Sequence, residues 1–258
     1  MTSKVNVELG MNKTLSIVTI TKNDIDGFLK TLESIVPFMN DSRIEWHVVD
    51  GGSSDGTEEF LRKFHPNNSH VHLTDLGLYQ SMNYGLDVSS GKYIIFMNSG
   101  DRFIGDGILK LLSLVQNLDF DWYIANAYAV DQNYDRIWKW NIPNHREIRF
   151  KWGMRSFCHQ STIIKRSKML EHGGFYTKSL FSDWQMSLKL SKDSPPAHLD
   201  LDLTEYLVGG RSSKTTLIYS VSHVVKLRSQ LYRIYVIGLF WETLIAFPLY
   251  LARRAKRK

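Results

Sequence analysis

Short apolar runs alternate with segments of helical periodicity through the first hundred residues, and this alternation leaves few folds open. Four runs rich in β-branched and aromatic residues predict strands, namely residues 15–21, 45–50, 71–75 and 92–98. Between the first two runs, apolar residues recur at helical spacing: Phe28, Leu29, Leu32 and Ile35. Strands separated by helices and short loops form a mostly parallel sheet with right-handed crossovers. We therefore predict an α/β fold in which helices flank a mostly parallel central sheet.

The length of 258 residues and the hydrophobic content of 43% suffice for one large domain, or for one domain with an appendage. After residue 120 the pattern loosens into aromatic, strand-like pieces such as DWYIANAYAV and DRIWKW. We expect an N-terminal extension (1–13), a main domain (14–212) and a C-terminal helical segment with a basic tail (213–258). The single cysteine, Cys158, excludes an intrachain disulfide and favours a reducing compartment. The N-terminus has no apolar run of signal-peptide length, so we expect the main domain to be cytoplasmic.

Positive charge is concentrated at the C-terminus. The final RRAKRK holds five cations, and subtracting them from the formal charge of +6 leaves +1 for the rest of the chain. Nucleic-acid binding needs cations along a face or groove, so this distribution argues against it and favours an anionic membrane surface.

Polar residues end three of the predicted strands. Thr21-Lys22-Asn23-Asp24 follows the first, Asp50-Gly51-Gly52-Ser53-Ser54-Asp55-Gly56 the second, and Asn98-Ser99-Gly100-Asp101 the fourth. In open α/β sheets, ligands bind at the carboxyl ends of the strands, where these side chains would converge. Two simpler interpretations stay open, because Asp55 can cap a helix and Asp50 can open a turn.

The loop DGGSSDGT has neither the GxGxxG order of a dinucleotide fold nor the GK[ST] of a P-loop. Its negative charge also makes it a poor phosphate cradle. A carboxylate at the end of a strand, such as Asp50, can accept hydrogen bonds from a nucleobase N–H or a ribose hydroxyl. The loop therefore favours a nucleoside site with the diphosphate held elsewhere.

The stretch Asn98-Ser99-Gly100-Asp101 is a candidate for that second role. Asp101 beside an asparagine offers oxygen ligands to Mg²⁺ or Mn²⁺, which bind through one or two carboxylates together with substrate phosphates. Gly100 would leave room for a diphosphate. The alternative is an ordinary β-turn before the next element, for which this composition is typical.

A resemblance to a known family is carried by six segments: LSIVTITKN, VVDGGSSDGT, DLGLYQSMNYGLDVSSGKYIIFMNSGD, CHQ, FSDW and VGGRS. Together they resemble the family 2 inverting glycosyltransferases with a GT-A (Rossmann-like) fold, over about residues 14–212. The similarity is to the bacterial branch that assembles O-antigen, capsule and colanic-acid repeat units.

The resemblance implies a role for particular positions. The nucleotide pocket would be lined by Thr21, Asn23 and Ser53, with Asp50 on the uracil or other base, Asn83 near the diphosphate and Arg211 in a loop that closes over the donor. Asp101 would bind the divalent cation, Mn²⁺ or Mg²⁺, with Asn98 beside it. Many members carry aspartates where this chain has Asn98 and Gly100.

Inverting transfer is one displacement, in which an acceptor hydroxyl attacks the anomeric carbon opposite the departing nucleoside diphosphate. A carboxylate must take the hydroxyl proton, and Asp183 in FSDW matches the family's catalytic base. The alternative is that Asp183 caps the helix that follows it, and the two roles are compatible.

His159-Gln160 matches an HQ pair of the same branch and is expected near the acceptor or diphosphate, although a histidine before a strand is often structural. Cys158 is interpreted as a small buried hydrophobe, since single displacement needs no nucleophile on the enzyme. The histidines, including His70 and His72, show no spacing typical of a zinc site.

Residues 234–252 are long enough to span a bilayer, but Glu242 and Pro248 interrupt them. We expect this segment to lie in the membrane interface, with packing on the domain or on a dimer partner, or spanning, as alternatives.

The predicted function is transfer from a nucleotide-sugar, taken as a UDP-sugar, to a polyprenyl-diphosphate-linked saccharide at the cytoplasmic face of the plasma membrane. The alternatives are a noncatalytic nucleotide-sugar-binding assembly subunit of the membrane and a nucleotidyltransferase.

Overall fold

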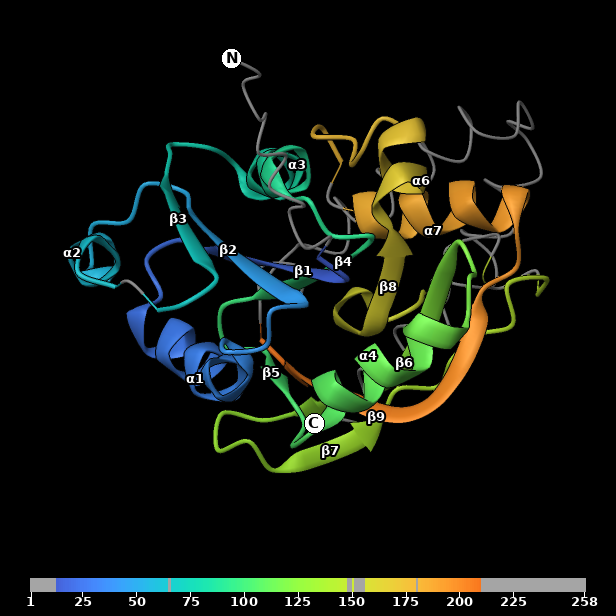
Figure 1. Cartoon of the computed structure of the whole chain (residues 1–258). Coiled ribbons are helices and arrows are strands. Elements are labelled where there is room, and N and C mark those ends of the chain that lie inside the picture. Colours follow the sequence, from blue (N-terminus) through green and yellow to red (C-terminus); the bar gives the residue numbers. More distant parts are fainter. Residues whose placement is uncertain (1–12, 65, 148–149, 151–155, 180, 210–258) are drawn as a thin grey trace, which may run out of the picture.

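A computed structural model describes residues 13–209, apart from 65, 148–149, 151–155 and 180 (Figure 1). The first half of the described chain contains β1 (Leu15–Thr21), α1 (Ile25–Ile35), the 3-10 turn η1 (Val36–Phe38), β2 (Ile44–Asp50), α2 (Thr57–Arg62), β3 (Ser69–Leu73), α3 (Leu78–Val88) and β4 (Tyr93–Asn98). The second half contains β5 (Arg102–Phe103), α4 (Gly107–Asn117), β6 (Trp122–Val130), β7 (Arg136–Lys139), η2 (His159–Ser161), β8 (Thr162–Lys165), α6 (Arg166–Glu171), α7 (Ser182–Asp193) and β9 (Ala197–Leu207).

One curled sheet runs through the described residues in the order β3-β2-β1-β4-β8-β6-β9-β5, with β7 paired to β6. The four strands of the N-terminal half are parallel to one another, as predicted. The second half is mixed, because β8 runs antiparallel to both β4 and β6 while β6 and β9 are parallel. The long pairings are the parallel ones, so the prediction of a mostly parallel α/β sheet is confirmed.

Both faces of the sheet are covered by helices. This explains why every residue of β1 and β2, and every residue of β4 except Asn98, is buried. Alternate residues of each strand face opposite sides. Ile17, Tyr93 and Ile95 pack under α1, α2 and α4, whereas Val18, Ile94 and Phe96 pack under α3, α6 and α7. Figure 1 shows these two helical layers on opposite sides of the strands.

The predicted N-terminal extension and C-terminal segment fall outside the description, apart from Lys13. No helix in the described part of the chain is long and apolar enough to cross a membrane. The predicted boundaries at residues 13 and 212 and the interfacial segment at 213–258 therefore stay predictions.

Candidate functional site

The polar strand ends meet at the carboxyl edge of the sheet, as predicted. Thr21 lies opposite Asp50 in the β1–β2 register, and Ile20 lies opposite Asn98 in the β1–β4 register. Backbone bonds continue this edge beyond the strands, from Gly51 N–H to Thr21 O (2.9 Å) and from Ser99 N–H to Ile20 O (3.0 Å). Three loops are thereby fixed side by side.

The loop after β2 uses the carboxylate of Asp50 internally. Asp50 is fully buried, and its oxygens accept bonds from the backbone N–H groups of Gly52 (3.2 Å) and Ser53 (3.0 Å) and from the Ser53 hydroxyl. The turn-opening alternative for Asp50 is thus confirmed. Its predicted contact with a nucleobase stays a prediction.

Asp55 bonds the first residue of α2 but is not its N-cap, which is Gly56, so the capping alternative for Asp55 is wrong. One of its oxygens accepts bonds from the Thr57 N–H (3.1 Å) and the Thr57 hydroxyl (2.6 Å). The other accepts the Ile25 N–H at 3.1 Å, which joins α2 to the start of α1.

Thr21, Asn23 and Ser53 belong to the same local structure. Asn23 has a left-handed backbone (φ +52°), and its amide oxygen accepts the Ser54 N–H at 2.7 Å while its own N–H donates to the Ser53 hydroxyl at 2.8 Å. The Thr21 hydroxyl is buried and has no hydrogen-bond partner among the described residues. The four predicted nucleotide-pocket residues of these two loops are therefore brought together, and the Thr21 hydroxyl among them is buried without a described partner.

The segment after β4 is a turn closed by a bond from the Asp101 N–H to Asn98 O at 3.1 Å. Gly100 has φ +90°, and a Cβ at this position would lie 2.9 Å from Leu207 Cδ2. The interpretation that Gly100 leaves room for a diphosphate is therefore wrong on that side, because Leu207 fills the space. The left-handed backbone and the contact with Leu207 account for the glycine.

Asp101 lies almost fully buried behind this turn, with 3% of its surface exposed. Its two oxygens accept bonds from the Gln160 side-chain amide (2.7 Å) and the Leu207 backbone N–H (2.9 Å). Burial raises the pKa of Asp101 to about 6, although both bonds oppose that shift.

His159 bridges the two ends of the site. One ring nitrogen, Nε2, lies 3.3 Å from the side-chain nitrogen of Asn98, and the other, Nδ1, lies 3.5 Å from an oxygen of Asp183. The neighbouring Gln160 holds Asp101. The HQ pair on η2 therefore connects the turn after β4 with α7.

Asp183 lies in the first turn of α7, but the residue at the N-cap is Phe181, so the capping alternative is wrong. Its carboxylate instead accepts the Tyr79 hydroxyl at 3.2 Å and faces His159. Burial would raise the pKa of Asp183, yet the bond and charge attraction from His159, with help from Trp184 N–H and Tyr79, outweigh it and lower the pKa. Asp183 is therefore an ionised, half-buried carboxylate at neutral pH.

Tyr79 is a site residue that the sequence reasoning missed. It lies in the first turn of α3, and both burial and the nearby Asp183 raise the pKa of its hydroxyl, so it stays a donor. Its position in the motif GLYQSMNYG, directly after a loop at the carboxyl edge, was the signal available.

Asn83, on the same helix, is engaged elsewhere: its amide exchanges two bonds with the backbone of Phe175, both of 2.8 Å. These contacts fix α3 to the segment before α7, and the predicted diphosphate contact of Asn83 stays a prediction.

Arg211 lies outside the described residues. Cys158 is buried, as predicted, but also donates to the Gln160 side-chain oxygen at 3.1 Å, and burial raises the pKa of its thiol.

Asn98 and Asp101 have the donor types that suit a hard divalent cation. The Asn98 amide oxygen is buried and has no hydrogen-bond partner in the described part of the chain. Each Asp101 oxygen accepts one bond and keeps a second lone pair. Oxygen ligands of this kind fit Mg²⁺ or Mn²⁺.

Residues 16–174 match the family described as "Glycosyl transferase family 2". An uncharacterized glycosyltransferase of Mycobacterium tuberculosis is 36% identical over 167 residues, which cover 63% of this chain and 62% of that protein. A "PGL/p-HBAD biosynthesis glycosyltransferase" of Mycobacterium bovis is 24% identical over 55% of this chain and 56% of that protein. The matched region thus spans less than two thirds of these relatives.

Solved structures resemble the fold more extensively. S. aureus TarS in complex with UDP-GlcNAc superposes with a TM-score of 0.68 at 16% identity, over 84% of this chain and 66% of that one. The mannosyltransferase PcManGT from Pyrobaculum calidifontis, in complex with GDP-Man and Mn²⁺, gives 0.62 at 17% identity, over 90% and 70%. At these identities the similarity shows the fold, which is the GT-A fold expected from the sequence.

Proposed function

The chain belongs to glycosyl transferase family 2, and from this premise we propose that it catalyses inverting transfer of a sugar from a nucleotide-sugar to an acceptor hydroxyl. We propose a UDP-sugar as the donor and a polyprenyl-diphosphate-linked saccharide as the acceptor. The product would be a repeat unit of a cell-surface polysaccharide such as O-antigen, capsule or exopolysaccharide.

The arrangement of Asp183 carries the proposal. An acceptor proton needs a carboxylate that is ionised, oriented and close to the carboxyl edge of the sheet. Asp183 is held from two sides, by Tyr79 at 3.2 Å and His159 at 3.5 Å, and its pKa is lowered. His159 in turn contacts Asn98 at the end of β4, so the orientation of the base depends on the strand end.

In this mechanism, Asp183 accepts the proton of the acceptor hydroxyl as its oxygen attacks the anomeric carbon. Tyr79 and His159 fix the direction of the Asp183 lone pairs. The residues that would hold a divalent cation are Asp101 and Asn98, and such an ion, when bound, would absorb negative charge on the departing diphosphate. The pair Thr21 and Asn23, at the end of β1, would contact the nucleotide.

The comparisons support the proposed donor class and a biosynthetic role. The solved structures with the same fold carry UDP-GlcNAc in one case and GDP-Man with Mn²⁺ in the other. The relative in Mycobacterium bovis is named as a glycosyltransferase of PGL/p-HBAD biosynthesis, which supports a biosynthetic role for the transfer.

The proposed location is the cytoplasmic face of the plasma membrane. Five cations in the final RRAKRK, beside an aromatic and aliphatic segment, suit a peripheral attachment to anionic lipid. A membrane-bound enzyme would then meet an acceptor that is carried on a polyprenyl diphosphate.

The test is transfer of radiolabelled sugar from a panel of UDP-, GDP- and TDP-sugars to a lipid-diphosphate saccharide, with and without EDTA. In Asp183→Asn, donor binding measured by calorimetry should stay within about threefold of wild type, while turnover should fall by about 10² to 10⁴. Asp193→Asn, an exposed carboxylate at the other end of α7, is the matched control and should transfer normally.

Unchanged turnover in Asp183→Asn would contradict the assignment of the base. No transfer from any donor by the wild-type chain, despite tight donor binding, would favour the noncatalytic alternative. The anomeric configuration of the product, read by NMR, tests inversion directly.

A further inference from the structure

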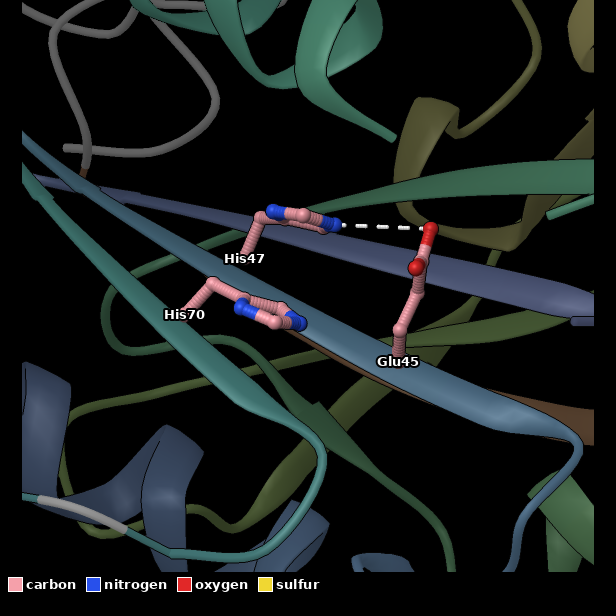
Figure 2. Close-up of side chains that lie close together, drawn as sticks. All are labelled: Glu45, His47 and His70. Atoms are coloured by element: carbon pink, nitrogen blue, oxygen red, sulfur yellow. Dashed lines mark ion pairs between the residues drawn. The ribbon is translucent and has the colours of Figure 1, made fainter. Parts of the chain in front are cut away.

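A compact group of metal-ligating side chains lies away from the candidate transfer site, on strands β2 and β3. Glu45 and His47 are two residues apart on β2 and face the same side of the sheet, and His70 of β3 lies opposite His47 in the register. One ligand atom from each of the three lies within 4.8 Å of the others. Figure 2 shows the carboxylate and the two imidazoles converging. Among the described residues this is the single group of three such side chains close enough to share an ion.

The buried nitrogen of His47 is the strongest feature of this group. His47 is 3% exposed, and its Nε2 has no hydrogen-bond partner among the described residues. This nitrogen points toward the Glu45 carboxylate, with Nε2 3.4 Å from Oε1. The His47 and His70 rings stack, with centroids 4.9 Å apart and planes 21° from parallel. Glu45 Oε1 is thus the one polar group that this nitrogen faces, at a distance longer than a normal N–H···O hydrogen bond, and an ion between the two would contact both.

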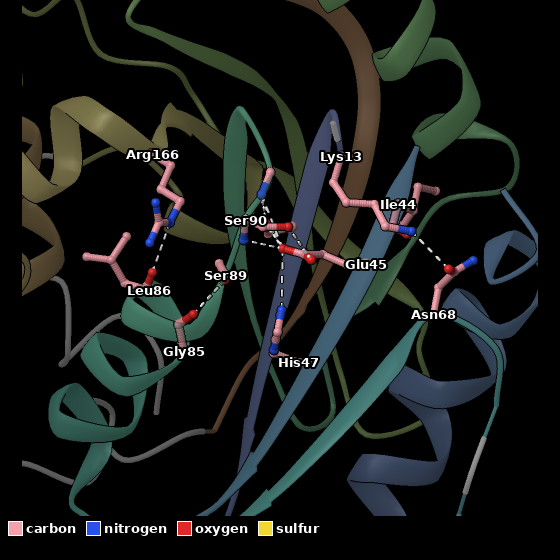
Figure 3. Close-up of polar contacts among 12 residues, drawn as sticks. Lys13, Ile44, Glu45, His47, Asn68, Gly85, Leu86, Ser89, Ser90 and Arg166 are labelled. Carbon is pink, nitrogen blue, oxygen red and sulfur yellow. Dashed lines mark hydrogen bonds and ion pairs between the residues drawn. The ribbon is translucent and has the colours of Figure 1, made fainter. Parts of the chain in front are cut away.

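Surrounding contacts hold the ligands in place. The Glu45 carboxylate accepts bonds from the Ser16 hydroxyl (2.6 Å), the Ser90 N–H (2.5 Å) and hydroxyl (2.7 Å), and the Gly91 N–H (3.2 Å). Figure 3 shows Glu45 between Ser90 and His47. The carboxylate therefore has one orientation, turned toward His47.

A third histidine, His72, holds the ring of His47 in place. His47 Nδ1 lies 3.2 Å from His72 Nε2, and His72 Nδ1 lies 3.4 Å from the Tyr84 hydroxyl. The tautomer of His47 that donates from Nδ1 to His72 leaves Nε2 unprotonated, as a metal ligand must be. Metal-binding histidines typically have their second ring nitrogen engaged in this way.

We propose that Glu45, His47 and His70 form a binding site for a divalent transition metal of the zinc class, distinct from the cation expected at Asp101. Two imidazoles and one carboxylate suit Zn²⁺ and its neighbours, whereas Mg²⁺ and Mn²⁺ prefer oxygen ligands. His70 is exposed, so a water molecule can complete a four-coordinate site from the solvent side.

The proposed zinc site lies at a different place on the sheet from the candidate transfer site. Glu45 precedes Asp50 by five residues, which is about 16 Å along an extended strand, so the ligands lie toward the amino end of β2. A bound ion would link β2 with the edge strand β3, and through Glu45 with the loop after α3. The spacing of the histidines along the sequence did not indicate a zinc site. The ligands proposed here come from two strands that are brought together by their pairing in the sheet.

The test uses the full-length protein stripped with chelator, titrated with Zn²⁺ by calorimetry and with Co²⁺ by visible absorption. We expect one equivalent of Zn²⁺ to bind and a Co²⁺ spectrum typical of four-coordinate nitrogen and oxygen ligation. His70→Gln should weaken Zn²⁺ binding at least about 100-fold, because losing a ligand costs no less than losing a supporting contact. His198→Gln, an exposed histidine on β9, is the matched control and should bind like wild type.

Asp101→Asn should also keep wild-type zinc affinity, which separates this site from the transfer site. His70 is exposed, so its variant is expected to fold, and circular dichroism verifies this. Three results would each overturn the proposal: no zinc binding by wild type below about 100 µM, zinc affinity in His70→Gln within threefold of wild type, or loss of zinc binding in Asp101→Asn.

Discussion

Asp101 is a buried carboxyl group whose charged form is disfavoured by its surroundings. Its pKa is about 6 in the folded protein against an ordinary 3.8, because burial outweighs the bonds from Gln160 and Leu207. The folded state therefore binds a proton more tightly than the unfolded state. It follows that the contribution of Asp101 to stability is full below pH 4, is lost as the pH rises to about 6, and stays constant above that.

For the metal-free protein we predict that this group lowers the free energy of unfolding by about 3 kcal/mol in total as the pH rises, about 2 kcal/mol of it between pH 4 and 6. Denaturant titrations at several pH values measure it. Asp101→Asn should lack this component, and the exposed control Asp87→Asn should retain it. Mn²⁺ on Asp101 would favour the ionised form, so added Mn²⁺ should reduce the pH dependence. An identical profile in Asp101→Asn would show that the buried carboxyl is not its source.

At the scale of elements, the turn after β4 depends on the backbone of Gly100. Gly56, which precedes α2, has a similar left-handed backbone (φ +97° against +90°), but a Cβ there would meet nothing within 4 Å. Alanine at either position costs roughly 1–2 kcal/mol of backbone strain. At Gly100 a Cβ would in addition lie 2.9 Å from Leu207.

The atom that this Cβ would meet is the end of the partly buried Leu207 side chain, so we predict that Gly100→Ala destabilises the protein by about 1 kcal/mol more than Gly56→Ala. Urea unfolding of the two variants gives the difference. Because the turn presents Asp101 and Asn98, Gly100→Ala should also lower sugar transfer, while Gly56→Ala should not. Equal destabilisation by both substitutions would mean that Leu207 adjusts without cost.

The elements of the first half could be predicted from the sequence because their signals are local. The periodicities of residues 15–98 predicted β1, β2, β3 and β4, separated by helices along the chain, and a mostly parallel sheet; the order of the strands within the sheet was not predicted. Strand β9 was missed, although AHLDLDLTEYL alternates apolar and polar residues through most of its length. Its partner β6 lies far away in the sequence, and nothing local indicates that they pair in parallel.

For the candidate site too, local sequence signals could be predicted and long-range contacts could not. Asp183 and the HQ pair were found because short motifs carry them, whereas their mutual contacts were not predictable. Tyr79 meets Asp183 across 104 residues, and Gln160 meets Asp101 across 59. The Glu45 group was missed for a related reason, since it assembles across the β2–β3 pairing.

At the scale of the whole molecule, the site forms where the second half of the chain closes onto the first. Leu207, at the end of β9, bonds Asp101 across 106 residues, and η2 inserts between β4 and α7. Each half supplies part of the chemistry: the first supplies the strand-end loops, and the second supplies Asp183, His159 and Gln160. Neither half alone contains the candidate site.

The uneven charge of the whole chain leads to the last prediction. Five of the cations behind the net charge of +6 lie in the final RRAKRK, so attraction to an anionic membrane should depend on this segment rather than on total charge. Each cation near such a surface contributes up to about 1 kcal/mol. Replacing all five with glutamine in the full-length chain should weaken binding to anionic vesicles at least about 100-fold in 0.1 M salt, as measured by co-sedimentation. The matched control removes five exposed lysines from the described domain, namely Lys30, Lys63, Lys110, Lys178 and Lys192. This control variant lowers the net charge equally and should bind the vesicles nearly as wild type does. Equal loss of vesicle binding in both variants would mean that overall charge, and not the tail, attracts the protein to the membrane.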